Sequence, residues 1–303
     1  GNYALLSELE QATAQLKQTG ACLVYPTGYQ ANVGLLTALF QKGDVIILDK
    51  LCHASLIDGA KLSGATVRVY PHGDLAYLEK VLAKTRDARR RAVVTESIFS
   101  MDGDLVRLPE IVNLLSEEAS GVRCQVSGNI FLIVDDAHGT GVLGSNGQGA
   151  KAHFGLGDDY PFEVIWTGTY SKALGSQGGF VCGSVALRDY LINHARAFIY
   201  TTGLAPAAAG AALAALRILQ HDQTLVKKLR ERIDGFNAKF KTQNAKCKTN
   251  QMSPIFPIIL GSNKAVLKKQ DELRQLGFWV PAIRFPTVKK GTERLRVSLR
   301  ADL

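Results

Sequence analysis

Short apolar runs separated by segments of helical spacing occupy most of the chain between residues 21 and 183. Apolar residues recur at helical intervals in the intervening segments, for example in Ala31–Phe40 and Leu75–Lys84. Strands that alternate with helices pair in parallel, and apolar strands of this kind are covered on both faces. We therefore expect an α/β fold with a seven-stranded, mainly parallel sheet. The expected strands are Ala21–Tyr25, Asp44–Leu48, Thr66–Tyr70, Ala92–Glu96, Ile130–Asp135, Val164–Thr169 and Phe180–Gly183.

The pattern changes after Pro206. An alanine-rich helical segment, Ala207–Gln220, leads into a strongly charged one around Leu225–Lys241. Three further strands are expected at Ile255–Leu260, Trp279–Ile283 and Leu295–Leu299. We therefore expect a large domain over residues 1–206 and a smaller α+β domain over residues 207–303.

Composition excludes several classes of protein. The net charge is +9, but the densest basic run, residues 84–91, is best explained as a solvated helix end, and no nucleic-acid recognition motif is present. The five cysteines are scattered without CxxC or Cys/His spacing, which argues against a metal site and predicts free thiols in a reducing cytoplasm. No apolar run approaches the ~20 residues of a membrane span, and no targeting leader is visible.

An acid and an imidazole follow the fifth expected strand. Asp135 ends this strand and His138 comes three residues later, beside Gly139 and Gly141. A strand-end aspartate can simply cap a turn, a role that Asp136 can also fill. Ligands of open α/β sheets bind beyond the carboxyl ends of the strands, so a functional role for Asp135 and His138 is the alternative.

A lysine follows the sixth expected strand. Lys172 comes after Thr169 and precedes a glycine-rich stretch, residues 175–179. Most isolated lysines are solvated surface charges, but a lysine at the end of an apolar strand is a better candidate nucleophile. A carboxylate, an imidazole and an amine that converge at strand ends suit pyridoxal 5'-phosphate (PLP), whose carbonyl forms a Schiff base with a lysine.

Other strand ends carry polar residues with a less specific signal. Gly28 and Tyr29 begin a helix whose amides could bind an anion, and His53 could cap a helix or stack on a planar ring. Glu96 ends the fourth expected strand, and Ser100 follows four residues later. Thr202 could bind a phosphate or merely start a helix, and Arg296 could bind a carboxylate or form a structural ion pair.

Together these segments resemble the α-oxoamine synthase family of PLP enzymes. The resemblance covers the whole chain and rests on residues 25–32, 53–55, 95–104, 134–144, 169–172, 199–206 and 282–298. It implies the fold-type I transferase architecture and a homodimer with shared active sites. The segments 282–288 and 291–296 most resemble the branch of the family that acts in biotin synthesis.

The resemblance also implies a role for each candidate residue. Lys172 is the Schiff-base lysine and moves the substrate Cα proton. Asp135 pairs with the pyridine nitrogen, His138 with the phenolic oxygen, and His53 stacks on the ring. The phosphate is expected to bind Gly28, Tyr29, Thr169 and, from the partner subunit, Thr202. Glu96 and Ser100 line the site, and Arg296 binds the amino-acid carboxylate.

The activity that the resemblance implies is a decarboxylative condensation of L-alanine with a pimeloyl thioester, carried by coenzyme A or acyl carrier protein. A glycine-using relative, a non-catalytic subunit of the same fold and an aminotransferase are the alternatives. Members of the family normally have an N-terminal segment before the helix that opens this chain, and a further C-terminal helix. We therefore expect both domains to be truncated.

Overall fold

The computed structural model of the chain describes residues 2–120, 130–242 and 252–302. They form two compact units. The first lies within Gly1–Ser97 and Val106–Asp222, and the second within Ile98–Leu105 and Gln223–Leu303. The domain boundary expected at residue 206 stays a prediction. Cys124 and Cys247 lie outside the described residues, whereas Cys22, Cys52 and Cys182 are buried free thiols.

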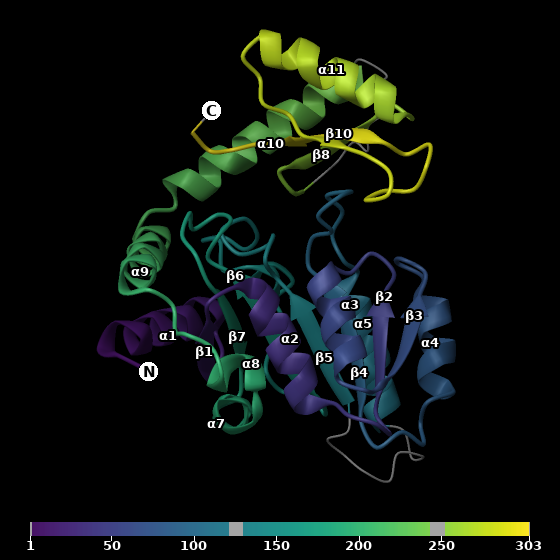
Figure 1. Cartoon of the computed structure of the whole chain (residues 1–303), viewed down its shortest axis with the longest axis vertical. Helices are drawn as coiled ribbons and strands as arrows, with labels where there is room; N and C mark the ends of the chain where they lie inside the picture. The colour runs from purple at the N-terminus through teal and green to yellow at the C-terminus, as the bar shows by residue number, and fades with distance from the viewer. Residues whose placement is uncertain (1, 121–129, 243–251, 303) are drawn as a thin grey trace. The chain divides into compact units, whose positions relative to one another are not determined.

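A seven-stranded sheet forms the centre of the first unit, as the sequence predicts (Figure 1). Its order is β1-β7-β6-β5-β4-β2-β3, and β2 to β6 are parallel to one another. The strands are β1 (Ala21–Tyr25), β2 (Val45–Asp49), β3 (Thr66–Tyr70), β4 (Arg91–Glu96), β5 (Ile130–Asp135), β6 (Glu163–Thr169) and β7 (Gly179–Gly183).

Strand β7 runs antiparallel to both of its neighbours. The connection from β6 to β7 covers only residues 170–178, too short for the crossover that a parallel strand needs. Because β7 is reversed between them, β1 and β6 run in the same direction. The carboxyl ends of β1, β2, β4, β5 and β6 therefore meet at one edge of the sheet, called the carboxyl edge below.

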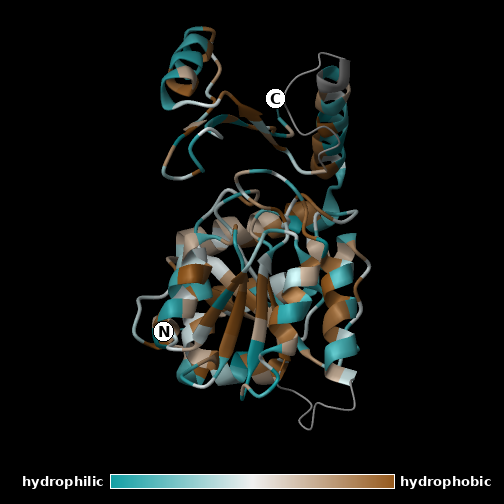
Figure 2. Ribbon diagram, turned by 90° about the vertical axis from the view of Figure 1, so that its right-hand side faces the viewer, coloured by the Kyte–Doolittle hydropathy of each residue, from teal (hydrophilic) through white to brown (hydrophobic). Residues whose placement is uncertain are grey.

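Helices cover both faces of this sheet. They are α1 (Ala4–Lys17), α2 (Gly28–Leu39), α3 (Ala54–Leu62), α4 (Leu75–Ala83), α5 (Leu108–Ser120), α6 (Ala150–His153), α7 (Val185–His194), α8 (Arg196–Ile199) and α9 (Pro206–His221). Helices α2 and α3 lie on one face, and α4 and α5 on the other, as right-handed crossovers require (Figure 1). Brown predominates in the central strands in Figure 2, while the helices show both brown and teal.

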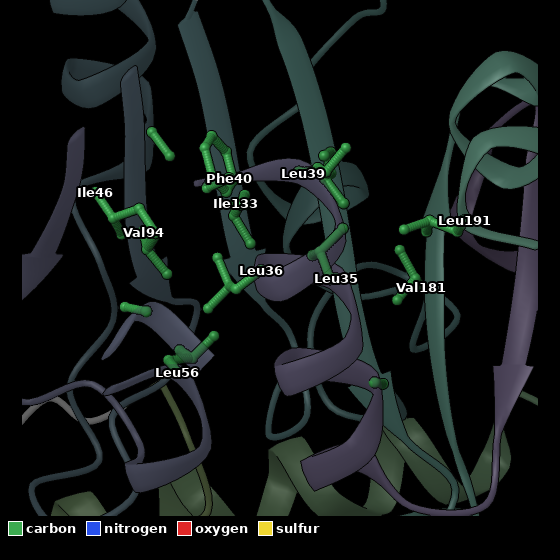
Figure 3. Close-up of a cluster of buried hydrophobic side chains, with 14 of the residues drawn as sticks. Leu35, Leu36, Leu39, Phe40, Ile46, Leu56, Val94, Ile133, Val181 and Leu191 are labelled. Carbon is green, nitrogen blue, oxygen red and sulfur yellow. The ribbon is translucent and has the colours of Figure 1, made fainter. Parts of the chain in front are cut away.

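The core beneath α2 is closely packed (Figure 3). Leu35 and Leu36 of α2 are fully buried and point toward alternate residues of the strands. The strand residues in this cluster include Ile46, Val94, Ile133 and Val181. Each buried side chain of this size contributes about 1.5–3 kcal/mol relative to exposure. This layer therefore fixes where α2 begins, at the carboxyl edge.

The second unit is a small antiparallel sheet with two helices. It contains α10 (Thr224–Thr242), β8 (Ile255–Ile259), α11 (Asn263–Gln275), β9 (Ala282–Ile283) and β10 (Arg294–Ser298), with strand order β8-β10-β9. The strand expected at Trp279–Ile283 is shorter than predicted. Trp279 is 77% exposed and stacks with the Arg274 guanidinium, 4.3 Å from its ring centroid, instead of joining the sheet.

None of the helices in the described part of the chain is both long and apolar enough to cross a bilayer.

Candidate active site

Asp135 ends β5 at the carboxyl edge and is 8% exposed. Its Oδ2 accepts a hydrogen bond from Asn32 Nδ2 at 2.8 Å, and its Oδ1 accepts one from the Ala137 amide at 3.0 Å. These donors fix the plane of the carboxylate. Because an ionised carboxylate can accept about four hydrogen bonds, Asp135 can still bind a cationic N–H group.

A chain of hydrogen bonds leads from Asp135 to His53. Asn32 also donates to Ser55 Oγ at 2.9 Å, and Ser55 Oγ lies 2.8 Å from His53 Nδ1. The Ser55 amide donates to the same Nδ1 at 3.2 Å. Since an amide can only donate, Nδ1 is an acceptor and the neutral ring carries its proton on Nε2. The network thereby fixes the orientation of His53, which is exposed at the start of α3.

Glu96 is the register neighbour of Asp135 on β4 and is 3% exposed. Its Oε1 accepts the His53 amide, which ties the start of α3 to the sheet. Burial raises the pKa of the Glu96 carboxyl well above its usual range, and the Asp135 charge raises it further. The His53 amide and the Lys172 ammonium oppose this shift in pKa. Glu96 thus keeps its proton to a higher pH than an exposed glutamate.

Lys172 follows β6 at the same edge and is exposed. The segment doubles back after the strand, because the Tyr170 amide donates to Gly178 O at 3.0 Å and the Gly175 amide to Lys172 O at 3.1 Å. Gly178 has a φ of +113°, which other residues rarely adopt. The charge of Lys172 acts to lower the pKa of Glu96, in the opposite sense to the charge of Asp135.

The start of α2 lies against the ends of β6 and β7. A Cβ on Gly28 would lie 3.3 Å from Thr169 Cβ, and one on Gly179 would lie 2.4 Å from Gly28 Cα. Thr27 Oγ1 accepts the Gln30 amide at 3.1 Å. The amides of Gly28 and Tyr29 are in the first helical turn and have no acceptor within the helix. They offer an anion-binding position beside Thr169, whose hydroxyl donates to Gly178 O at 2.8 Å.

Two further predicted residues lie in the first unit. His138 is half-buried in the turn that follows β5, where the Gly139 amide donates to Asp136 O at 3.1 Å. Thr202 is exposed in the segment that leads to α9. Its neighbour Thr201 accepts a hydrogen bond from Gln30 Nε2 at 3.1 Å, which brings this segment beside the first turn of α2.

Ser100 and Arg296 belong to the second unit, although Ser100 is close to Glu96 in the sequence. Arg296 Nε donates to Ser100 O at 2.6 Å, and Arg294 Nη1 to Asp102 Oδ1 at 2.8 Å. These contacts join the segment 98–105 to β10. Burial lowers the pKa of the Arg296 guanidinium. One of its five N–H groups is used by Ser100, and the guanidinium fork suits a carboxylate.

Asn32 and Ser55 are site residues that were not predicted from the sequence. Asn32 lies on the buried side of α2 among Ala31, Leu35 and Leu36. A polar residue within an apolar helix face needs a partner, and this is the signal that could have identified Asn32. Ser55 follows His53 by two residues and gives no comparable signal.

The side chains at the carboxyl edge fit PLP. Asp135 can accept the N–H of a protonated pyridine, and an imidazole with a fixed orientation is exposed nearby. Lys172 supplies the amine, and the start of α2 offers amides to a phosphate. No cluster of potential metal ligands is found among the described residues.

Known proteins match the chain over its whole length. The family model described as aminotransferase class I and II matches residues 1–303. The 8-amino-7-oxononanoate synthase of Methylococcus capsulatus is 42% identical over 301 residues, which cover 99% of this chain and 74% of that protein.

Solved structures agree with this match. A Francisella tularensis structure of 8-amino-7-oxononanoate synthase is 30% identical, with a TM-score of 0.84 over 100% of this chain and 83% of that one. A structure of serine palmitoyltransferase from S. paucimobilis with a bound PLP–myriocin adduct is 27% identical, with a TM-score of 0.90, and covers 100% of this chain and 73% of that one. The chain therefore belongs to the aminotransferase class I and II family.

Proposed function

We propose that the chain condenses L-alanine with a pimeloyl thioester, releasing carbon dioxide and the free thiol, to give 8-amino-7-oxononanoate for biotin synthesis. Relatives about 40% identical over nearly the whole chain carry the name of this synthase. The observation that carries the proposal is that Glu96, Asp135 and Lys172 end or follow β4, β5 and β6, three neighbouring parallel strands whose carboxyl ends meet at the carboxyl edge. It supplies the acid and the amine that this chemistry needs.

The cofactor is PLP, which when bound supplies an electron-withdrawing ring that stabilises negative charge on the substrate Cα. Lys172 holds the cofactor covalently and then moves the Cα proton of the substrate. Asp135 keeps a proton on the pyridine nitrogen, and His138 donates a hydrogen bond to the phenolic oxygen. The bonds from Asn32 and Ala137 hold the Asp135 carboxylate in place for this contact.

Other residues position the cofactor. His53 lies against the ring face, in the orientation that Ser55 and Glu96 set. Gly28, Tyr29 and Thr169 bind the phosphate through amides and a hydroxyl. Thr202 reaches the phosphate of the partner subunit in a homodimer with shared sites.

Arg296 binds the substrate carboxylate, while Glu96 and Ser100 line the site. Residues 1–206 form the PLP-binding domain and residues 207–303 the smaller domain. The buried free thiols Cys22, Cys52 and Cys182 favour a reducing, cytoplasmic location.

Borohydride trapping tests the lysine assignment. The protein is mixed with PLP, reduced with borohydride and digested, and the adduct is located by peptide mass. Wild type should carry the adduct on Lys172, and Lys172→Ala should carry none there. The same adduct yield in both proteins would overturn the assignment.

Product assays test the substrate assignment. Alanine and glycine are each supplied with pimeloyl, acetyl and succinyl thioesters of coenzyme A, and the amino ketone and carbon dioxide are measured. Alanine with the pimeloyl thioester should give the highest kcat/KM. A clear preference for glycine would assign the chain to a sister activity, and transfer of the amino group to a keto acid would assign it to an aminotransferase.

A further inference from the structure

Helix α1 carries two polar residues on its buried side. Thr13 and Lys17 are four residues apart, so they lie one above the other on the same face of the helix. They are 0% and 2% exposed. Burying a charged or polar group is costly unless it is hydrogen-bonded, so both residues need defined partners. Each of them has hydrogen-bond partners outside α1.

Lys17 binds the turn that follows β5. Its Nζ donates to Asp136 Oδ2 at 2.5 Å, to Thr140 Oγ1 at 2.6 Å and to Gln148 O at 3.0 Å. These acceptors account for all three N–H groups of an ammonium. Asp136 directly follows Asp135, and His138 lies within the same turn. Lys17 of α1 thus holds the segment that carries Asp135 and His138.

The turn is built closely around this ion pair. A Cβ on Gly139 would lie 1.9 Å from Asp136 Oδ1, and a Cβ on Gly149 would lie 1.9 Å from Asp136 Oδ2 and 2.5 Å from Lys17 Nζ. The backbone therefore approaches the carboxylate more closely than any side chain would allow. The Ala150 amide also donates to Asp136 Oδ2 at 3.1 Å. The path of residues 136–150 consequently depends on the pair.

Thr13 binds the segment that carries Lys172. Its hydroxyl donates to Leu9 O at 2.7 Å, so the proton of the 2.8 Å contact between Thr13 Oγ1 and Tyr170 Oη comes from the tyrosine. Tyr170 is fully buried and precedes Lys172 by two residues. One face of α1 therefore contacts both segments of the candidate site, through one polar residue each.

We propose that Thr13 and Lys17 are positioning residues, and that α1 sets the relative placement of the Asp135–His138 turn and the Lys172 segment. This inference rests on the site assigned under the proposed function. Lys17 also neutralises Asp136, so that of the two adjacent acids only Asp135 presents its charge to the cofactor. Both residues act through the segments that they hold, and neither contacts the substrate.

The test compares Lys17→Met with Leu16→Ala, a control that removes another buried side chain from the same turn of α1. PLP affinity, the pH midpoint of the visible band of bound PLP, and the melting temperature are measured for each. Lys17→Met should bind PLP roughly tenfold more weakly, at the lower end of the losses known for residues that support metal ligands. It should also shift the pH midpoint, whereas Leu16→Ala should lower only the melting temperature.

Lys17→Met leaves the Asp136 carboxylate buried without its counter-charge, and this variant can fail to fold. Two further variants, Lys17→Met/Asp136→Asn and Thr13→Val, are therefore measured as well. The double variant removes both charges and should fold. It should keep the loss of affinity but show a smaller shift in midpoint than Lys17→Met, because no uncompensated charge remains beside Asp135. Thr13→Val should move the midpoint by a smaller amount. If all of these variants keep wild-type affinity and midpoint while only their melting temperatures fall, Thr13 and Lys17 are merely structural. If wild type itself gives no adduct on Lys172, the site assignment fails, and this inference fails with it.

Discussion

Two glutamates at opposite edges of the sheet have opposite surroundings. Glu96 at the carboxyl edge has the acid Asp135 as its register neighbour, and burial raises its pKa. Glu118 near the amino edge accepts hydrogen bonds from Arg86 and Arg91, and these lower its pKa although burial opposes them. Near the amino edge Glu118 is thus paired with opposite charges, which stabilises the fold. At the carboxyl edge like charges are held together, which is typical of a functional site.

The largest effect should come from removing the Asp135 charge. Asp135→Asn keeps the shape of the side chain but cannot hold a proton on the pyridine nitrogen. Activity with alanine and a pimeloyl thioester should fall by roughly 10²–10³-fold or more, on the scale of other lost electrostatic contacts. Steady-state kinetics and PLP titration measure this, and binding of PLP should persist.

The matched control at the amino edge is Asp44→Asn. Asp44 is fully buried and accepts hydrogen bonds from Arg89 and the Gln41 amide. This variant should lose stability and keep the activity of its folded fraction. Equal losses of activity in the two variants would remove the distinction between the edges.

Arg91→Met should cause the next largest effect, on stability alone. The Arg91 side chain is 1% exposed and donates to Glu118 Oε1 at 2.8 Å and to Leu82 O at 3.1 Å. Removing one partner of a buried pair costs about 3–5 kcal/mol, and the remaining contact of Glu118 with Arg86 favours the lower end. Urea unfolding measures the change. A loss below about 1 kcal/mol, the value of an exposed pair, would contradict the assignment of a stabilising role.

The pH dependence of stability should have opposite signs at the two glutamates. The pKa of Glu96 is raised in the folded protein, so wild-type stability falls as pH rises from the unfolded value toward the folded one. Glu96→Gln removes this loss, and its stability relative to wild type should increase across that window.

The pKa of Glu118 is lowered in the folded protein. Its contribution to stability is therefore present above the pKa of the unfolded chain and is lost as pH falls toward the pKa of the folded protein. Glu118→Gln should therefore be less stable than wild type at neutral pH, by a margin that shrinks in acid.

Unfolding of the cofactor-free protein is measured at several pH values between about 4 and 8, the range around and above the ordinary glutamate pKa. Parallel curves for wild type and Glu96→Gln would contradict the raised pKa of Glu96.

The smallest effect should come from Ser55→Ala. It removes the hydroxyl that links Asn32 to His53 and leaves both ends of the network in place. Of the two hydrogen bonds lost, the one to His53 bears on the cofactor, and it is worth about 1 kcal/mol, or about fivefold in PLP affinity. Fluorescence titration with PLP measures it, and Ser63→Ala, which changes a serine at the other end of α3, is the control. An unchanged affinity would show that His53 keeps its orientation without Ser55.

The sheet could be predicted closely because its strands are apolar runs with polar or glycine residues at their ends. Ala21–Tyr25, Thr66–Tyr70 and Ile130–Asp135 have the predicted bounds. The strand expected at Trp279–Ile283 is shorter because hydrophobicity alone does not pair a strand, and Pro281 lacks the amide that a ladder needs.

The candidate site was predicted through the residues that end strands. Its supporting contacts were not, because they join positions that are distant in the sequence. Asn32 and Asp135 are 103 residues apart, and Lys17 and Asp136 are 119 apart. Local sequence patterns predict the helix that carries a polar residue, but they do not predict which turn that residue binds. Only the topology of the sheet brings these positions together.

The ion pair between Lys17 and Asp136 also imposes an order on biosynthesis. Its two members are separated by 119 residues, so α1 is complete long before its acceptors exist. At a synthesis rate of about 5–20 residues per second, roughly 6–24 seconds pass between them. During that interval Lys17 stays in water, since burial without an acceptor would be costly. Helix α1 is therefore expected to dock only after residue 150 has left the ribosome, a delay that proteolysis of arrested nascent chains would measure.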